Sequence, residues 1–140
     1  GDEVARYLAE CTAPDARVLV IGFRPDVPFV ARRMFAGGHS WLLPGYVSGA
    51  ANQQRMADWL AADPPAAIVV DPVEGATFRT DFPAIAAIIA GYHAPRTVSG
   101  LDVYVSRTMP VSGTHAGTGL PCHVLGARAA VGAPLTRPTR

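Results

Sequence analysis

The apolar residues of this chain form two continuous runs, separated by stretches with helical periodicity. Residues 16–22 and 66–71 are rich in valine, isoleucine and leucine, and the runs end at Gly22 and Asp71. Continuous apolar runs of this length suit parallel strands that helices cover on both faces. The pattern therefore predicts an α/β fold organised around two buried parallel strands.

Amphipathic stretches predict four helices around these strands. Apolar residues recur there at three- and four-residue spacing, which places them on one face of a helix. Asp2 is expected to cap the first helix, and Gly37-Gly38 to end the second. The predicted helices span residues 3–11, 26–34, 48–62 and 82–92.

Shorter strands complete the expected sheet. Residues 40–43 are a strand candidate that ends at Pro44-Gly45, and residues 96–98 and 101–106 flank the two-residue turn Ser99-Gly100, which is typical of a hairpin. The fold class that follows is a three-layer, Rossmann-like α/β sandwich. Its sheet is expected to be mostly parallel, with an antiparallel hairpin at the C-terminal edge.

The periodicity stops near Thr108, which divides the chain into two parts. Residues 1–107 are expected to form one soluble α/β domain, and residues 108–140, rich in proline, glycine and alanine, a disordered tail. Cys11 lies on the apolar face of the first helix, where we expect a buried structural thiol. Cys122 lies in the expected tail, and a bridge between the two cysteines would require an oxidising compartment.

Composition and charge narrow the function classes. The chain has 140 residues and a formal net charge of +1, and residues 1–107 lack the clustered basic excess that is typical of nucleic-acid-binding domains. All twelve basic residues are arginine, so neither a Walker A lysine nor a Schiff-base lysine exists in this segment. No apolar stretch is long enough to span a bilayer. Because the sequence starts at Gly1, we expect a segment of a longer polypeptide, with any membrane anchor upstream.

Polar residues that follow the predicted strands are the first ligand candidates. Ligands of open α/β sheets bind beyond the carboxyl ends of the parallel strands. This placement predicts a small-molecule site formed by Arg24, Asp26, Asp71 and Arg79, with Gly22 and Glu74 beside it. The same residues are also suited to capping helices, ending strands and pairing with each other, so both interpretations stay open.

Other motifs give no catalytic residue, metal site or cofactor. Gly22 is followed by Phe23 and Arg24, so the G-x-G-x-x-G of dinucleotide-binding folds is missing. Residues 38–42 begin like a nucleophile elbow but end in leucine and lead into a strand. The remaining ligand types are isolated or match no zinc spacing. They are His39, His93, His115, Cys122 and His123.

The order and spacing of several segments resemble a known family. The segments are Pro14 to Gly22, Ser40 to Gly45, Asn52-Gln53-Gln54, Asp63 to Asp71, Asp81-Phe82-Pro83, Tyr92, and Leu101 to Tyr104. Together they resemble the soluble carboxyl-terminal domain of bacterial multispanning GT-C membrane glycosyltransferases, the group related to protein mannosyltransferases and the lipid A aminoarabinose transferase. The resemblance covers about residues 2–107.

The resemblance implies a transferase that uses a polyprenyl-phosphate-linked sugar donor at the extracytoplasmic face of the bacterial cell membrane. The catalytic acidic residues of that family lie in a loop between early membrane helices, so no catalytic residue is carried over. This domain would pack on the membrane-embedded portion of the same polypeptide and help to shape the site for the lipid-linked sugar or acceptor. Two alternatives remain: a stand-alone ligand-binding or regulatory module, and an interaction domain that docks through the edge from Trp41 to Tyr46.

Overall fold

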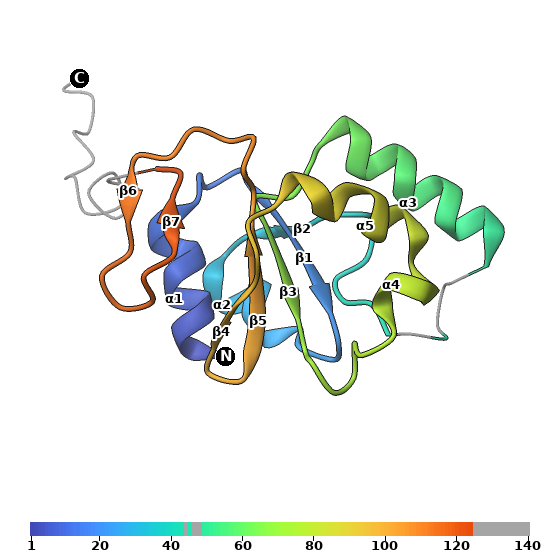
Figure 1. The fold of residues 1–140 in the computed structure, drawn as a ribbon, viewed down its shortest axis with the longest axis horizontal. Coiled ribbons are helices and arrows are strands. Elements are labelled where there is room, and N and C mark those ends of the chain that lie inside the picture. Colours follow the sequence, from blue (N-terminus) through green and yellow to red (C-terminus); the bar gives the residue numbers. More distant parts are fainter. Residues whose placement is uncertain (44, 46–48, 125–140) are drawn as a thin grey trace, which may run out of the picture.

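The computed structural model describes residues 1–43, 45 and 49–124, which form a mixed α/β fold (Figure 1). A five-stranded sheet has the order β2-β1-β3-β5-β4. Four of its strands run in one direction and β5 runs in the other, because β1 pairs in parallel with β2 and β3 while β5 is antiparallel to β3 and β4. The strands are β1 (Arg17–Ile21), β2 (Met34–Phe35), β3 (Ala67–Val70), β4 (Arg96–Val98) and β5 (Leu101–Val105).

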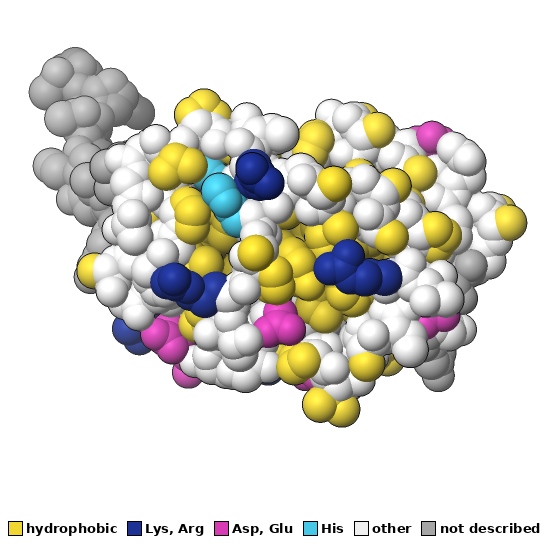
Figure 2. Space-filling view, in the orientation of Figure 1, with side chains coloured by type: hydrophobic (Ala, Val, Ile, Leu, Met, Phe, Trp, Pro, Cys, Tyr) yellow, Lys and Arg dark blue, Asp and Glu magenta, His cyan; other side chains and the backbone are white. Residues whose placement is uncertain are grey.

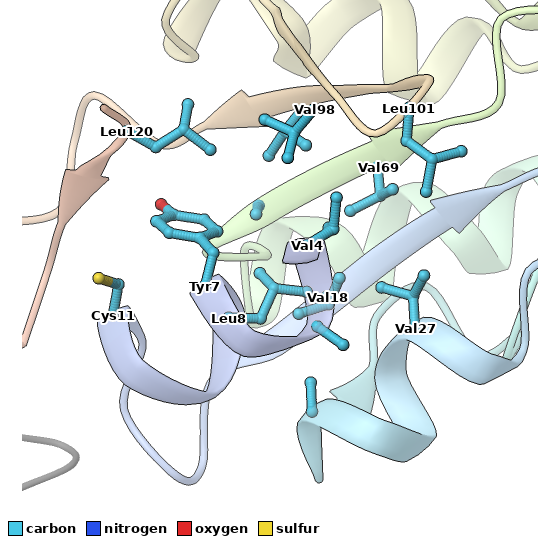
Figure 3. Packing of buried hydrophobic residues seen from close by; sticks show 14 of the residues in the cluster. Val4, Tyr7, Leu8, Cys11, Val18, Val27, Val69, Val98, Leu101 and Leu120 are labelled. Carbon is cyan, nitrogen blue, oxygen red and sulfur yellow. The ribbon is translucent and has the colours of Figure 1, made fainter. Parts of the chain in front are cut away.

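The two predicted central strands are confirmed, and both of their faces are buried. Alternate side chains of β1 point to opposite faces, so Val18 and Val20 join one apolar core while Leu19 and Ile21 join the other. The first core also holds α1 (Asp2–Cys11) and α2 (Asp26–Ala31), and Figure 3 shows Tyr7 and Leu8 of α1 pointing toward the strands. The second core holds α3 (Ala50–Ala62), α4 (Phe78–Asp81), α5 (Pro83–Ile88) and the 3-10 helix η1 (Ile89–Gly91).

The hairpin at the C-terminal edge of the sheet is confirmed. β4 and β5 pair around Ser99 and Gly100, whose φ angles of 49° and 80° are both positive. Two positive φ angles are the mark of a type I′ turn, whose twist matches that of the flanking strands.

Three predicted element boundaries are wrong. α2 ends at Ala31, because Arg32 adopts a left-handed conformation (φ 52°) and Met34–Phe35 then pairs with β1. The helix predicted over 82–92 is broken into α5 and η1, and it starts at Pro83 because the residue before a proline disfavours helix. The cap of α1 is Gly1, whereas Asp2 lies in the first turn.

The strand expected at residues 40–43 is reduced to one bridge. Leu42 pairs with Ile21, and its N–H donates to the Val20 carbonyl at 2.8 Å. The expected end of this strand at Pro44 and the helix start at Ser48 lie outside the described residues. A further short helix, α4, lies before residue 82, where the periodicity predicts no helix.

The structure differs from the expected tail over residues 108–124. β6 (Gly113–Thr114) and β7 (Pro121–Cys122) form a small antiparallel hairpin that lies beside α1 (Figure 1). The buried Tyr7 hydroxyl donates to the Pro121 carbonyl at 2.7 Å, and His123 N donates to the Cys11 carbonyl at 2.9 Å. These bonds need partners more than 100 residues apart, so local periodicity could not reveal them. The division at Arg107 stays a prediction, and residues 125–140 lie outside the described part.

A disulfide joins Cys11 of α1 to Cys122 of β7. The interpretation of Cys11 as a free buried thiol is therefore wrong. It failed because the ordered hairpin holds the Cα of Cys122 at 4.4 Å from the Cα of Cys11, whereas the expected tail gave Cys122 no fixed position. We call residues 108–124, held to α1 by this bond, the strap.

Candidate functional site

The loops that follow β1 and β3 meet at the predicted ligand edge. Asp71 N donates to the Ile21 carbonyl at 2.8 Å, and Gly22 turns away from the sheet with φ 111°. A Cβ atom at Gly22 would lie 2.6 Å from the Asp71 Cβ, which is too close for any other residue. The sequence therefore placed Gly22 and Asp71 correctly as neighbours.

The carboxylates at this edge bond to the backbone of the two loops. Asp71 Oδ1 accepts from Val73 N at 2.9 Å and from Glu74 N at 3.0 Å. Glu74 in turn accepts from Phe23 N, which ties the loop after β3 to the loop after β1. Both carboxylates thus hold the shape of the loops, which is the structural role that the sequence left open.

Arg24 and Asp26 form a two-bond ion pair beside these loops. Arg24 Nε and Nη2 donate to the Asp26 carboxylate at 3.0 and 2.8 Å. This pairing lowers the pKa of Asp26 and raises the pKa of Arg24, and the charges of Asp71 and Glu74 add smaller contributions to Arg24. The charge of the guanidinium is therefore neutralised mainly by Asp26, two residues further along the chain.

Arg79 takes part in a different set of contacts. Its guanidinium lies 5.2 Å from the centre of the Phe78 ring, and Nη2 donates to the Tyr104 hydroxyl at 3.5 Å. Phe78 and Tyr104 belong to the core that holds α3, α4 and α5. The four predicted ligand residues are thus divided among three separate contacts: Arg24 with Asp26, Asp71 with its loop, and Arg79 with two aromatic rings.

Two histidines of the strap have specific partners. His115 Nε2 lies 3.0 Å from the Glu10 carboxylate, and its Nδ1 accepts from Thr118 N at 3.2 Å. His123 Nε2 lies 3.1 Å from the Ser106 carbonyl, while its Nδ1 is buried without a partner in the described part of the chain. Burial lowers the pKa of His123, and the charge of His93 acts in the same direction. Sequence reasoning missed these pairs because they depend on where the strap lies.

The described residues contain no cluster of three or more histidine, cysteine or acidic side chains that could hold a metal ion. On the face in Figure 2, basic side chains stand apart from one another, with acidic side chains between them. No helix in the described ranges is both long and apolar enough to cross a membrane.

An apolar groove lies between α2 and the edge strand β2. It has a volume of about 620 Å³. Its lining is mainly apolar and consists of Pro25, Asp26, Pro28, Phe29, Arg33, Met34, Phe35 and Ser40. Sequence reasoning placed Phe29 and Val30 on a helix but assigned them no role. The sequence signal for an exposed apolar surface was segment 28–34, which has more apolar residues than one helix face can bury.

The alternative docking edge at Trp41 is only partly described. Trp41 is half-buried and packs edge-on against Phe23, with ring centres 5.0 Å apart. Tyr46 lies outside the described residues, so that edge stays a hypothesis.

Comparison with protein-family models, with curated proteins and with solved structures finds no match to this chain. The interpretation of its function therefore rests on its own residues and on the resemblance described above.

Proposed function

We propose that this chain is the extracytoplasmic accessory domain of a polytopic membrane glycosyltransferase, and that it is not itself catalytic. The parent enzyme would use a polyprenyl-phosphate-linked sugar donor in a bacterial cell membrane. The partner of the domain would be the membrane-embedded portion of the same polypeptide, with the lipid-linked sugar or acceptor nearby and no nucleic acid involved.

The disulfide between Cys11 and Cys122 is the observation that carries this proposal. Disulfides persist in extracytoplasmic compartments and are rare in the bacterial cytoplasm. Both cysteines are buried, so the bond is part of the packed structure. A location outside the cytoplasm agrees with the resemblance, which was drawn from other residues.

The bonding at the strand ends supports a role without catalysis. Asp71 and Glu74 accept from backbone donors and Asp26 pairs with Arg24, so the acidic groups that could act as base or nucleophile stabilise loops. A general base needs a free position within hydrogen-bond reach of its substrate.

We also propose that the fold is a three-layer, Rossmann-like sandwich. Helices lie on both faces of the sheet, which supports a three-layer, Rossmann-like arrangement. The antiparallel strand β5, next to β3, is a departure from the fully parallel form of that fold.

The second candidate is the stand-alone ligand-binding or regulatory module. It requires Arg24 or Arg79 to exchange its present partner for an anionic ligand. Because Arg24 is already neutralised by Asp26, we rank this function second.

The first test is the hydropathy of the full-length gene product upstream of Gly1, taken in a window of about 19 residues. We expect a series of membrane spans with an acidic pair in the first extracytoplasmic loop. Finding no span would overturn the proposal and leave the ligand-binding module, to be tested with anionic metabolites against Arg24→Gln.

A second test uses the full-length enzyme in membranes. Replacing the acidic pair of the upstream loop is expected to abolish sugar transfer, whereas Asp71→Asn and Glu74→Gln should leave the chemical step intact. Loss of transfer at saturating donor in the Asp71 or Glu74 variant, with normal folding and membrane insertion, would contradict the non-catalytic role.

A further inference from the structure

The apolar surface around α2 is exposed to an unusual degree. Phe23, Phe29, Val30 and Met34 expose 55%, 83%, 54% and 53% of their area. They are four of the seven large apolar side chains that are exposed within the described residues, and they come from one segment of twelve residues, 23–34. We call these four side chains the α2 surface. Exposed apolar side chains that lie together are typical of interaction sites, and Phe29 and Met34 line the same groove.

The α2 surface borders the groove described above. Phe29 and Met34 line the groove, so apolar contact area is available within a hollow as well as on protruding side chains. Phe29 exposes most of its ring from a short helix, so it can enter a soft apolar layer without a matching protein pocket, whereas the Phe23 ring is partly held by its edge-on contact with Trp41.

The charge of the same segment is positive. Residues 23–34 contain three arginines and one aspartate. Arg24 pairs with Asp26, and Arg33 points inward to carbonyls of α1 and the following turn, so Arg32 is the exposed cation of the segment. Apolar side chains combined with excess arginine favour binding to a membrane surface, where anionic headgroups cover an apolar layer.

We propose that the α2 surface docks on anionic phospholipid headgroups, with Phe29 and Met34 entering the interface and Arg32 contacting phosphate. The proposal rests on the proposed function, which places the domain beside a membrane, and it names the lipid that the domain touches. The partner is the bilayer surface itself. A second copy of this chain on the α2 surface is an outcome of the test.

The experiment is flotation of the 140-residue chain, disulfide intact, with vesicles. One set contains phosphatidylglycerol and phosphatidylcholine in equal parts, and the other contains phosphatidylcholine alone. We expect binding to the first set that weakens as salt is raised, because anionic headgroups attract the arginine. The double variant Phe29→Ser/Met34→Ser should lower the partition coefficient at least about tenfold. Arg32→Gln should lower it about fivefold.

Matched variants separate the α2 surface from other parts of the chain. Val111→Ser removes an equally exposed apolar side chain of the strap, and Arg55→Gln removes an exposed arginine of α3; neither should change binding. A triple variant of Arg128, Arg137 and Arg140 to glutamine tests the basic end of the chain. Circular dichroism melts of every variant exclude unfolding as the cause of a loss.

Three results would overturn the proposal. They are no binding to either vesicle set, binding that the double variant retains, and binding that only the triple variant loses. Concentration-dependent dimerisation that the double variant abolishes, without vesicle binding, would assign the α2 surface to a second copy. The hydropathy upstream of Gly1 is an independent readout. Membrane spans without vesicle binding overturn only the lipid contact, and vesicle binding without spans overturns only the proposed function.

Discussion

α1 and α2 pack side by side against the same face of the sheet, but the strap contacts α1 and leaves the solvent side of α2 uncovered. The strap covers one side of α1 through a disulfide, the bond from Tyr7 to Pro121 and the contact of His115 with Glu10. The outer side of α2 is bare and shows Phe29 and Val30 to solvent. A long C-terminal segment therefore packs on one helix and leaves its neighbour open. The difference indicates that the strap stabilises the fold at α1 and that the exposed side of α2 contacts a partner.

The largest expected effect on stability comes from removing the disulfide that holds the strap to α1. The double variant Cys11→Ser/Cys122→Ser removes a cross-link between residues 111 apart and should lower the free energy of unfolding by about 4 kcal/mol. Denaturant titration measures the loss. Adding a dithiol to the unfolding buffer should bring the wild type to the stability of the variant and leave the variant unchanged. Equal stability of the wild type with and without dithiol would contradict a stabilising strap.

The next largest loss of stability is expected on replacing Arg33, which links the end of α2 to the end of α1. Arg33 Nη2 donates to the carbonyls of Ala9 and Thr12 at 3.0 and 2.9 Å, and Nε donates to the Thr12 hydroxyl at 2.9 Å. These bonds satisfy the carbonyls at the C-terminal end of α1, so Arg33→Met should cost about 2 kcal/mol of unfolding free energy.

Its neighbour Arg32 is exposed and provides the control. Arg32→Lys should change stability by less than about 0.5 kcal/mol. Equal losses of unfolding free energy in the two variants, measured by urea titration, would contradict the role of Arg33 in linking α2 to α1.

A smaller effect is a dependence of the strap on pH. Burial holds the pKa of His123 below its usual value, and protonation would place a second N–H where the buried Nδ1 has no acceptor in the described structure. The folded state therefore binds this proton less readily than the unfolded state. Stability should be complete above the unfolded pKa of about 6.5 and fall as the pH drops toward the folded pKa.

Thermal melts between about pH 7 and about pH 5 measure this loss. The His123→Gln variant should show a shallower dependence, whereas His39→Gln, outside the strap, should keep that of the wild type. An unchanged slope in His123→Gln would contradict the assignment.

The smallest effect on stability is expected at the open side. Phe29 exposes 83% of its area, so Phe29→Ser should change the free energy of unfolding by less than about 0.5 kcal/mol while it weakens vesicle binding. The buried Phe82, replaced by alanine, should cost about 3 to 5 kcal/mol and is the matched contrast. A large loss in Phe29→Ser would mean that the ring supports the fold, against the comparison of the two helices.

The candidate site was predictable in part. The rule that ligands lie beyond strand ends brought Gly22 and Asp71 together correctly, because both follow neighbouring parallel strands. It could not predict that Asp71 accepts hydrogen bonds from the backbone of its own loop or that the Arg79 guanidinium packs against the Phe78 ring. Those outcomes depend on short-range competition between hydrogen-bond partners, which residue type and spacing do not encode.

The sequence by itself determined the central strands, α1 and the β4–β5 hairpin. Continuous apolar runs, an apolar stripe on a helix and a Ser-Gly turn are local signals, and their physical causes act within a few residues. The tertiary structure alone decided that α2 ends early, that the strap is ordered and that Cys11 meets Cys122. Each of these depends on contacts between residues far apart in the chain, where the energy gained by pairing and burial exceeds local propensity.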